Sequence, residues 1–428
     1  MRQGIDEQST LARYFHMRPA ILLLLLLLTS CRETPPAVST PLPQRAYVWQ
    51  REWTPAVSAA THEASNLDGL IVLGAEVAWK NGQPHIIRPA VDWAALRATK
   101  KTIGIALRID PFSGPFSSDD ERLRLFVKLA HSLLDERKEN SVPCPEFQVD
   151  FDCAQKKLAG YRLWLRELRG AVKPARLVIT TLPSWLDEPE FRTLINEVDA
   201  YVLQVHSVPT QNEAGRVALC DVAQAQRRVA KAAKLGKPFI VSLPTYSAVV
   251  GYDANGHLLG MALDGVQPSW PAGTRVVEFT SDADELSRLI HGWQNQRPAA
   301  MEGLVWYRLP VSTDARNWRW PTFAAVIEGR APTRKLKVLT AGENPADLSF
   351  SNEGEAEEPL RDTVLVRWDG PAPLAAEALP GWTVTMTGND ARFAPASVAG
   401  PRLMPGAKRG IGWLRFEQRA FLHVEIIR

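Results

Sequence analysis

The sequence predicts an α/β protein, a (β/α)8 TIM-like barrel followed by a small all-β C-terminal domain. Two observations predict the barrel: apolar runs recur over residues 45–330, and amphipathic segments separate them. A change to short alternating apolar stretches over residues 331–428 predicts the β-rich domain. Eight strands alternating with helices over roughly 280 residues fit a TIM barrel. A doubly wound open sheet is the alternative, although no glycine-rich phosphate loop follows the first strand.

The amino terminus has the layout of a signal peptide. The apolar run 20–28 follows Arg18 and ends three residues before Cys31. A spanning helix needs about 20 apolar residues, so this run is too short to cross a membrane as a mature anchor. The four residues that end at Cys31, Leu-Thr-Ser-Cys, resemble the lipobox of bacterial lipoproteins, in which the cysteine is acylated and becomes the first mature residue. An ordinary secretory signal with an incidental cysteine is the alternative.

This resemblance implies lipidation of Cys31 and an extracytoplasmic protein whose partner is a membrane, contacted through the lipid anchor. Two or more acyl chains hold a protein stably on a bilayer. Arg32 stands where, by resemblance to Gram-negative sorting rules, an aspartate would retain the protein at the inner membrane, so we expect the outer membrane, facing the periplasm. Residues 1–31 would be the signal peptide, and residues 32–44, with four prolines, an extended tether. Translation starts at Met1 or at Met17.

The composition argues against a nucleic-acid partner and predicts no cofactor. Lys and Arg (50) exceed Asp and Glu (47) by only three, and no basic run supplies the electrostatic footprint that nucleic acid requires. Zinc normally takes three protein ligands, and the sequence does not place such a set at diagnostic spacing. Fourteen tryptophans is a high count. Most should pack in the core, with platforms for sugar rings as the functional alternative.

The expected barrel strands are apolar and rich in β-branched residues, as parallel strands buried on both faces should be. They are Ala46–Arg51, Leu70–Glu76, Thr102–Asp110, Glu146–Cys153, Arg176–Leu182, Ala200–Ser207, Pro238–Tyr246 and Gly303–Leu309. Apolar residues at spacings of three and four predict helices between them. The clearest are Asp119–Arg137, Ala154–Val172, Asp221–Leu235 and Asp282–Gln296.

The expected strands of the β-rich domain are shorter and alternate in polarity. They are Lys337–Thr340, Thr363–Trp368, Trp382–Thr387, Trp413–Phe416 and Phe421–Ile427. Turn-rich or acidic stretches such as 341–359 separate them.

The active end of a TIM barrel is where its strands end, so the polar residues at those positions are the candidate site. Besides the fourth strand, they are Glu76, Arg108, Asp110, Trp185, Gln204, His206, Tyr246, Trp306 and Arg308, all expected to bind substrate. The strongest motif lies on the fourth strand. Side chains alternate along a strand, so Gln148, Asp150 and Asp152 share one face. Polar side chains inside a barrel are costly unless they serve a ligand, a metal or each other.

Asp150 and Asp152 are the candidate catalytic pair, with Gln148 as a further substrate contact. Glycoside hydrolysis needs one carboxylic acid to protonate the leaving oxygen and one carboxylate as base or nucleophile. Residues at i and i+2 lie about 6.5–7 Å apart on a strand, close enough for one carboxylate to raise the pKa of the other. The structural alternative is a cluster in which Arg108 and backbone amides bind both carboxylates.

The chain also resembles a known family. The segments QVDFDC, WLRELR with Tyr161, ITTLPSWL, YVLQVHS, PFIVSLPTY and EGLVWYRLP are similar to the bacterial family described as domain of unknown function 3142. This resemblance covers about residues 45–330 and implies a glycoside-hydrolase-like TIM barrel, without an established activity. The fourth strand also resembles the family-18 chitinase signature Asp-x-Asp-x-Glu, but Gln148 and Asp152 depart from it. An aspartate in the place of the acid is one methylene shorter, which puts chitinase-type hydrolysis in doubt.

Other constellations are weaker. His206 near the carboxylates is a metal ligand only if partners join it, and a hydrogen-bonding role is the plainer interpretation. Ser184 lacks the glycines of a nucleophile elbow. Trp185, Trp306 and Tyr307 stack on sugar faces or pack at the barrel rim.

Two functions remain open at this point: a cell-envelope enzyme that acts on a polysaccharide or glycan, and a non-catalytic glycan-binding or scaffold lipoprotein. The cysteines give one further expectation. Cys144 and Cys153 should lie roughly 25 Å apart at opposite ends of a strand, too far for a bridge. A Cys153–Cys220 disulfide is therefore the hypothesis, with three reduced, buried thiols as the alternative.

Overall fold

The structure is a computed structural model that describes residues 37–208, 218–263, 269–397 and 401–427. These residues belong to one compact unit, Ala37–Arg428. The expected signal peptide and the expected lipidation site Cys31 lie outside the described residues. Among the residues described, none of the helices has the length and apolar character needed to span a membrane.

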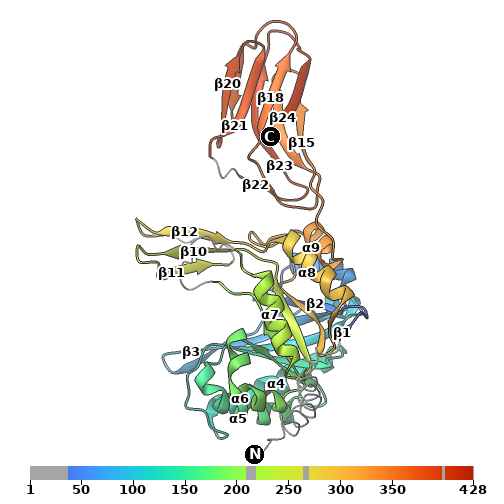
Figure 1. Ribbon diagram of the computed structural model, residues 1–428, viewed down its shortest axis with the longest axis vertical. Helices are drawn as coiled ribbons and strands as arrows, with labels where there is room; N and C mark the ends of the chain where they lie inside the picture. Colours follow the sequence, from blue (N-terminus) through green and yellow to red (C-terminus); the bar gives the residue numbers. More distant parts are fainter. Residues whose placement is uncertain (1–36, 209–217, 264–268, 398–400, 428) are drawn as a thin grey trace, which may run out of the picture. The chain divides into compact units, whose positions relative to one another are not determined.

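The centre of the fold is a closed barrel of eight parallel strands (Figure 1). In chain order they are β2 (Gln44–Val48), β3 (Gly69–Lys80), β5 (Thr102–Ile109), β6 (Glu146–Phe151), β7 (Arg176–Thr181), β8 (Ala200–Gln204), β9 (Phe239–Pro244) and β14 (Met301–Tyr307). Each pairs in parallel with the next, and β14 pairs with β2 to close the ring. The predicted barrel is confirmed, and each predicted run overlaps one of these strands.

Alternation along the strands divides the apolar side chains into two cores. One set fills the barrel interior and includes Ile71, Ala106, Val178, Val202 and Ile240. The other set packs outward against the helices and forms a much larger core. Inward and outward residues alternate along barrel strands, so these two sets fix which side chains can reach a site inside the mouth of the barrel.

The four predicted helices are confirmed as α4 (Glu121–Glu139), α5 (Leu158–Ala171), α7 (Val222–Ala233) and α8 (Ala283–Asn295). Asp120, Asp221 and Asp282 cap three of them by accepting backbone N–H groups of the first turn. Shorter helices complete the described chain: α2 (Pro55–Glu63), α3 (Trp93–Ala98), α6 (Pro189–Leu194), α9 (Trp320–Ile327), and the 3-10 turns η1 (Ala64–Asn66), η2 (Gln155–Lys157), η3 (Pro183–Asp187) and η4 (Ile195–Glu197).

A three-stranded antiparallel sheet is inserted between β9 and α8. It consists of β10 (Ala248–Tyr252), β11 (Leu258–Ala262) and β12 (Arg275–Phe279), which lie side by side in Figure 1. A short strand, β4 (Gln83–Ile87), also extends β3 as a hairpin. The sequence analysis did not predict these strands.

Residues 37–44, which the composition assigned to the tether, are held against the barrel. The strand β1 (Ala37–Val38) pairs with β13 (Arg297–Pro298). The guanidinium of Arg297 donates to the backbone oxygens of Thr40 and Pro41 at 2.6 and 2.8 Å. Prolines lack N–H donors but keep their carbonyl acceptors, so a proline-rich segment can dock on a buried arginine.

The C-terminal domain consists of two four-stranded antiparallel sheets around one core. The first sheet has the order β15 (Leu336–Ala341), β16 (Ala346–Asn352), β23 (Lys408–Arg415), β19 (Ala375–Ala378). The second has the order β20 (Trp382–Thr387), β21 (Asp390–Pro395), β18 (Thr363–Trp368), β24 (Leu422–Ile427), and a two-residue pair joins β17 (Glu358–Pro359) to β22 (Arg402–Leu403). The predicted all-β domain is confirmed, but stretch 341–359 is not only turn: it contains β16, whose buried Leu348 and Phe350 alternate with polar residues.

The disulfide hypothesis is wrong. Cys144, Cys153 and Cys220 are all buried, and Cys153 is a free thiol, so it forms no bridge to Cys220. Cys153 follows β6, whereas Cys220 precedes α7, which follows β8. The intervening strand β7 and the turn η3 separate them, and Trp185 of that turn donates to the Cys153 carbonyl at 3.1 Å.

Candidate active site at the mouth of the barrel

A pocket of about 470 Å³ lies at the carboxyl ends of the barrel strands. It brings together six residues of the predicted site: Arg108, Asp150, Asp152, Gln204, His206 and Tyr246. They come from β5, from β6 and the residue after it, and from the ends of β8 and β9 and the segments that follow. Tyr47 of β2, Thr180 of β7 and Tyr307 of β14 also line the pocket, so seven of the eight barrel strands contribute to it. Such convergence cannot be read from one stretch of sequence.

Asp150 is the best-fixed carboxylate of the pocket. The strand register pairs Asp150 with Arg108 on β5, and β7 lies on the other side of β6. The Arg108 Nη1 donates to the Asp150 Oδ2 at 2.7 Å, and the Thr180 hydroxyl donates to the Asp150 Oδ1 at 2.7 Å. The residue is 6% exposed. Both carboxylate oxygens therefore act as acceptors, which holds the group in one orientation.

Asp152 follows β6 and lies on the pocket wall, where part of its side chain reaches solvent. The protein partly removes water from around its carboxyl, and the charge of Asp150 acts in the same sense. Together they raise the pKa of Asp152, although Arg108 opposes them. The carboxyl thus favours the protonated form more than an ordinary aspartate does.

His206 is held as a neutral imidazole between hydroxyl groups. Its Nε2 lies 3.2 Å from the Ser242 hydroxyl and its Nδ1 lies 3.5 Å from the Tyr246 hydroxyl. The ring stacks on Tyr307 at an interplanar angle of 25°. Burial lowers the pKa of His206 to about 4, and burial also raises the pKa of Tyr246. Both groups are therefore uncharged hydrogen-bonding partners at neutral pH.

Three aromatic side chains from β2, its end and β14 line the pocket. Tyr47, Trp49 and Tyr307 meet edge to face, with ring centroids 5.0, 5.7 and 6.0 Å apart. The sequence analysis missed Tyr47 and Trp49 and named Tyr307 only for stacking. The alternation Tyr-Val-Trp at 47–49 was the available signal, because it places two large rings on one face of the first strand.

Three predicted substrate contacts are corrected. Gln148 is fully buried below the pocket, where it accepts from Tyr47 and donates to Glu146. Trp185 and Trp306 are fully buried in the outer core, and their indole N–H groups bond to Cys153 and Gln44. These rings pack between strands and helices, so they are not available for sugar stacking.

Glu76 and Arg308 lie in an adjoining pocket of about 580 Å³. Arg51 donates to both carboxylate oxygens of Glu76, at 2.8 and 2.7 Å. Arg308 lies 3.3 Å from Asp314. Asp110 lines neither pocket; its backbone N–H donates to Val77, beyond the end of β5.

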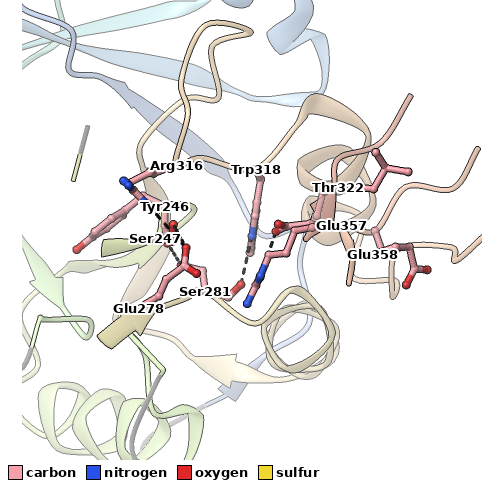
Figure 2. Close-up of polar contacts among 12 residues, drawn as sticks. Tyr246, Ser247, Glu278, Ser281, Arg316, Trp318, Thr322, Glu357 and Glu358 are labelled. Carbon is pink, nitrogen blue, oxygen red and sulfur yellow. Dashed lines mark hydrogen bonds and ion pairs between the residues drawn. The ribbon is translucent and has the colours of Figure 1, made fainter. Parts of the chain in front are cut away.

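A third pocket, of about 280 Å³, is lined by Tyr246 and by polar side chains whose contacts Figure 2 shows. Trp318 donates its indole N–H to the backbone oxygen of Ser281 at 3.2 Å. Glu278 accepts from Ser247 at 3.2 Å, and Arg316 lies 4.0 Å from it. These contacts join the segments next to Tyr246, although the Nε of Arg316 is buried without a hydrogen-bond partner among the described residues.

The donor set at the mouth of the barrel is not that of a metal centre. Among the described residues, no group of three or more His, Cys, Asp or Glu side chains is placed to hold a metal ion. The arrangement instead provides one fixed carboxylate, one carboxyl with a raised pKa, neutral hydrogen-bonding groups and flat apolar faces. Such a set can position a polyhydroxylated ligand and transfer a proton to it.

The protein is thus a (β/α)8 barrel protein with a carboxylate pair and an aromatic pocket at the mouth of the barrel. The model of the family described as domain of unknown function 3142 matches residues 117–312, which confirms the family resemblance over those residues. No curated protein matches the chain.

Among solved structures, the chain is similar to three enzymes at low identity. Chitinase ChiA74 from Bacillus thuringiensis is 10% identical with a TM-score of 0.44, over 91% of this chain and all of that one. The Bacillus cereus spore cortex-lytic enzyme SleL is 13% identical with a TM-score of 0.47, over 69% and 75% of the two chains. A chitinase from Bacteroides thetaiotaomicron is 13% identical with a TM-score of 0.45, over 63% and 90%.

Proposed function

We propose that the protein is a cell-envelope enzyme that cleaves glycosidic bonds in a polysaccharide or glycan, with Asp152 as the general acid and Asp150 as its anionic partner. The observation that carries the proposal is the contrast between two neighbouring carboxyl groups in one pocket. Asp150 is fixed by Arg108 and Thr180, whereas Asp152 has a raised pKa. A carboxyl group with a raised pKa can serve as the acid of glycoside hydrolysis when a second carboxylate lies beside it.

Asp152 suits the acid role because it is the member of the pair that has no hydrogen-bond partner among the described residues. Its carboxyl is free to turn toward a leaving-group oxygen at the rim of the pocket. A raised pKa keeps a larger fraction protonated near neutral pH, and transfer of that proton neutralises the departing oxygen.

Asp150 suits the anionic role. Cleavage of a glycosidic bond develops positive charge on the sugar ring, and a fixed carboxylate stabilises such charge without having to reorganise. Both of its oxygens already accept hydrogen bonds, so attack on the sugar by either oxygen would weaken a bond from Arg108 or Thr180. The geometry therefore favours charge stabilisation or activation of a water.

The aromatic cluster and His206 suit the binding of sugar rings. Tyr307 presents a partly exposed ring, backed by the buried rings of Tyr47 and Trp49, while the neutral groups of His206 and Tyr246 can exchange hydrogen bonds with hydroxyls. The second candidate function is a glycan receptor without turnover. It is favoured by the completeness of the Arg108–Asp150–Thr180 cluster, which is satisfied without substrate.

The envelope location is part of the proposal and rests on the amino-terminal sequence. Lipidation of Cys31 would anchor the chain to a membrane, most consistently the outer membrane with the barrel facing the periplasm.

The test compares the full chain with Asp152→Asn on polysaccharide fractions prepared from the envelope, with released reducing ends as the readout. We expect Asp152→Asn to lower turnover by about 10²-fold or more while ligand binding persists, because proton transfer by a positioned group contributes about 10²–10⁴. Asp135→Asn, an exposed aspartate on α4, is the matched control and should retain full turnover. Binding without turnover by the unmodified chain would establish the receptor instead.

A further inference from the structure

The pocket that contains the two aspartates continues into the adjoining pocket. Trp49, Arg108, Leu263 and Tyr307 line both, so the two volumes of about 470 and 580 Å³ meet along a shared wall. Each volume lies within the range of about 300–1,000 Å³ that holds a whole small ligand. The mouth of the barrel therefore has room for sugar units on both sides of the Trp49–Tyr307 contact.

The inserted sheet supplies one side of this combined groove. Met261 of β11 lines the second pocket and is 42% exposed, and Leu263 lies just beyond the same strand. Met261 pairs with Val250 of β10, whereas Val276 of β12 pairs with the next residue, Gly251. Successive residues of a strand point to opposite faces, so Met261 faces the groove and the equally exposed Val276 (43%) faces away.

Four arginines line the groove, and three of them are ion-paired within the protein, whereas Arg228 donates to the backbone oxygen of Val205 at 3.5 Å. Arg51 pairs with Glu76, Arg108 with Asp150, and Arg308 with Asp314. The side chains of these three carboxylates are only 8–11% exposed. An anionic sugar could recruit one of the three ion-paired arginines only by leaving a buried carboxylate unpaired, which is strongly unfavourable. The additional carboxylates Glu52 and Asp152 also line the groove and repel an anion.

From the shared wall and the paired charges, we infer that the two pockets form one groove for an internal stretch of an uncharged glycan chain. The inference rests on the proposed function and specifies its substrate class. Asp152 acts in the first pocket, and the second pocket holds the neighbouring sugar units between Met261 and the fixed ion pairs. Hydroxyl groups can add hydrogen bonds to those pairs without separating them, whereas uronate or phosphate groups cannot.

The experiment uses the full chain in detergent, carrying Asp152→Asn so that ligand is bound and not consumed. The probe is envelope polysaccharide separated by anion exchange into a neutral and an acidic fraction, and binding is measured by retardation in affinity electrophoresis. Met261→Glu is compared with Val276→Glu, its matched control on the opposite face. We expect the neutral fraction to retard the Asp152→Asn chain. Adding Met261→Glu should weaken binding by about tenfold or more, since a charge in the groove must be desolvated, and Val276→Glu should leave it unchanged.

Three results overturn the inference: retardation mainly by the acidic fraction, retardation by neither, or equal binding by the Met261→Glu and Val276→Glu chains. Its failure is distinguishable from that of the proposed function. If the unmodified chain releases reducing ends but the Met261→Glu and Val276→Glu chains bind alike, the inference of one continuous groove is refuted and the proposed enzyme activity is supported. If the neutral fraction binds in a Met261-dependent way but is never cleaved, the proposed enzyme activity is refuted and the inference of the groove is supported.

Discussion

Acidification should destabilise the barrel through His206. The folded protein lowers the pKa of this imidazole from 6.5 to about 4 by burial. Between these two values the unfolded chain binds a proton that the folded chain does not, so stability is complete above pH 6.5 and is lost as the pH falls toward 4. The full shift corresponds to about 3 kcal/mol, of which about 2 kcal/mol is already lost at pH 5.

The assay is urea unfolding at pH 7.5 and pH 5, followed by tryptophan fluorescence. His206→Asn cannot gain this proton, so its unfolding free energy should fall between the two pH values by about 2 kcal/mol less than that of the unmodified chain. His85→Asn removes an exposed histidine and should leave the pH dependence unchanged. The reasoning is refuted if His206→Asn and the unmodified chain lose the same stability, or if the His206 imidazole titrates near 6.5 in the folded protein.

Three further outcomes follow from the structure. Arg108→Met should lower the unfolding free energy by about 2–3 kcal/mol, because it leaves the buried Asp150 carboxylate without its cation; in urea unfolding, addition of Asp150→Asn should recover part of that loss, and strictly additive losses would contradict the pairing. If Asp152 is the acid, turnover should decline as the pH rises through its raised pKa, and Asp152→Asn should abolish that alkaline decline; a variant that keeps the same decline would assign the acid role elsewhere. Cys31→Ser should abolish fatty-acid labelling and leave barrel unfolding unchanged; labelled Cys31→Ser chain in the membrane fraction would disprove lipidation at this residue.

The barrel could be predicted from the sequence because its strands are nearly continuous apolar runs and the main helices have clear periodicity. It was harder to predict which side of the barrel wall each side chain faces. Glu76 reaches the interior only because the register shifts between Leu73 and Ala75, which places Gly74 as an extra residue and moves Glu76 level with Arg108. A strict period of two predicts the opposite face, since Ile71 and Leu73 already point inward.

The same problem affected the rings. The sequence analysis offered Trp306 and Trp185 as sugar platforms because they lie near the ends of apolar runs. Trp306, however, lies two residues after the outward-facing Leu304 and so faces outward too, and Trp185 belongs to the turn η3. Tyr307 has the parity of Val305 and points inward. Parity within a strand was readable from the sequence, whereas the depth of each ring depends on the packing of helices that the strand sequence does not describe.

The strand β6 shows why the acid should be sought at the rim and not deeper in the barrel. Its inward-facing polar residues follow one another along the strand, and each has different hydrogen-bond or ion-pair partners. Glu146 pairs with Arg45 at 3.0 Å and accepts from Gln148, which in turn accepts from Tyr47. One level higher, Asp150 is bound by Arg108 and Thr180. Buried polar groups need hydrogen-bond partners, so the contacts of Glu146, Gln148 and Asp150 stabilise the fold. Asp152 follows Asp150 beyond the end of the strand. Its carboxyl is near solvent and the charge of Asp150, and it has no hydrogen-bond donor among the described residues. A proton held there can be given to a ligand without breaking an interaction that the barrel needs, which is the physical reason to assign proton transfer to Asp152.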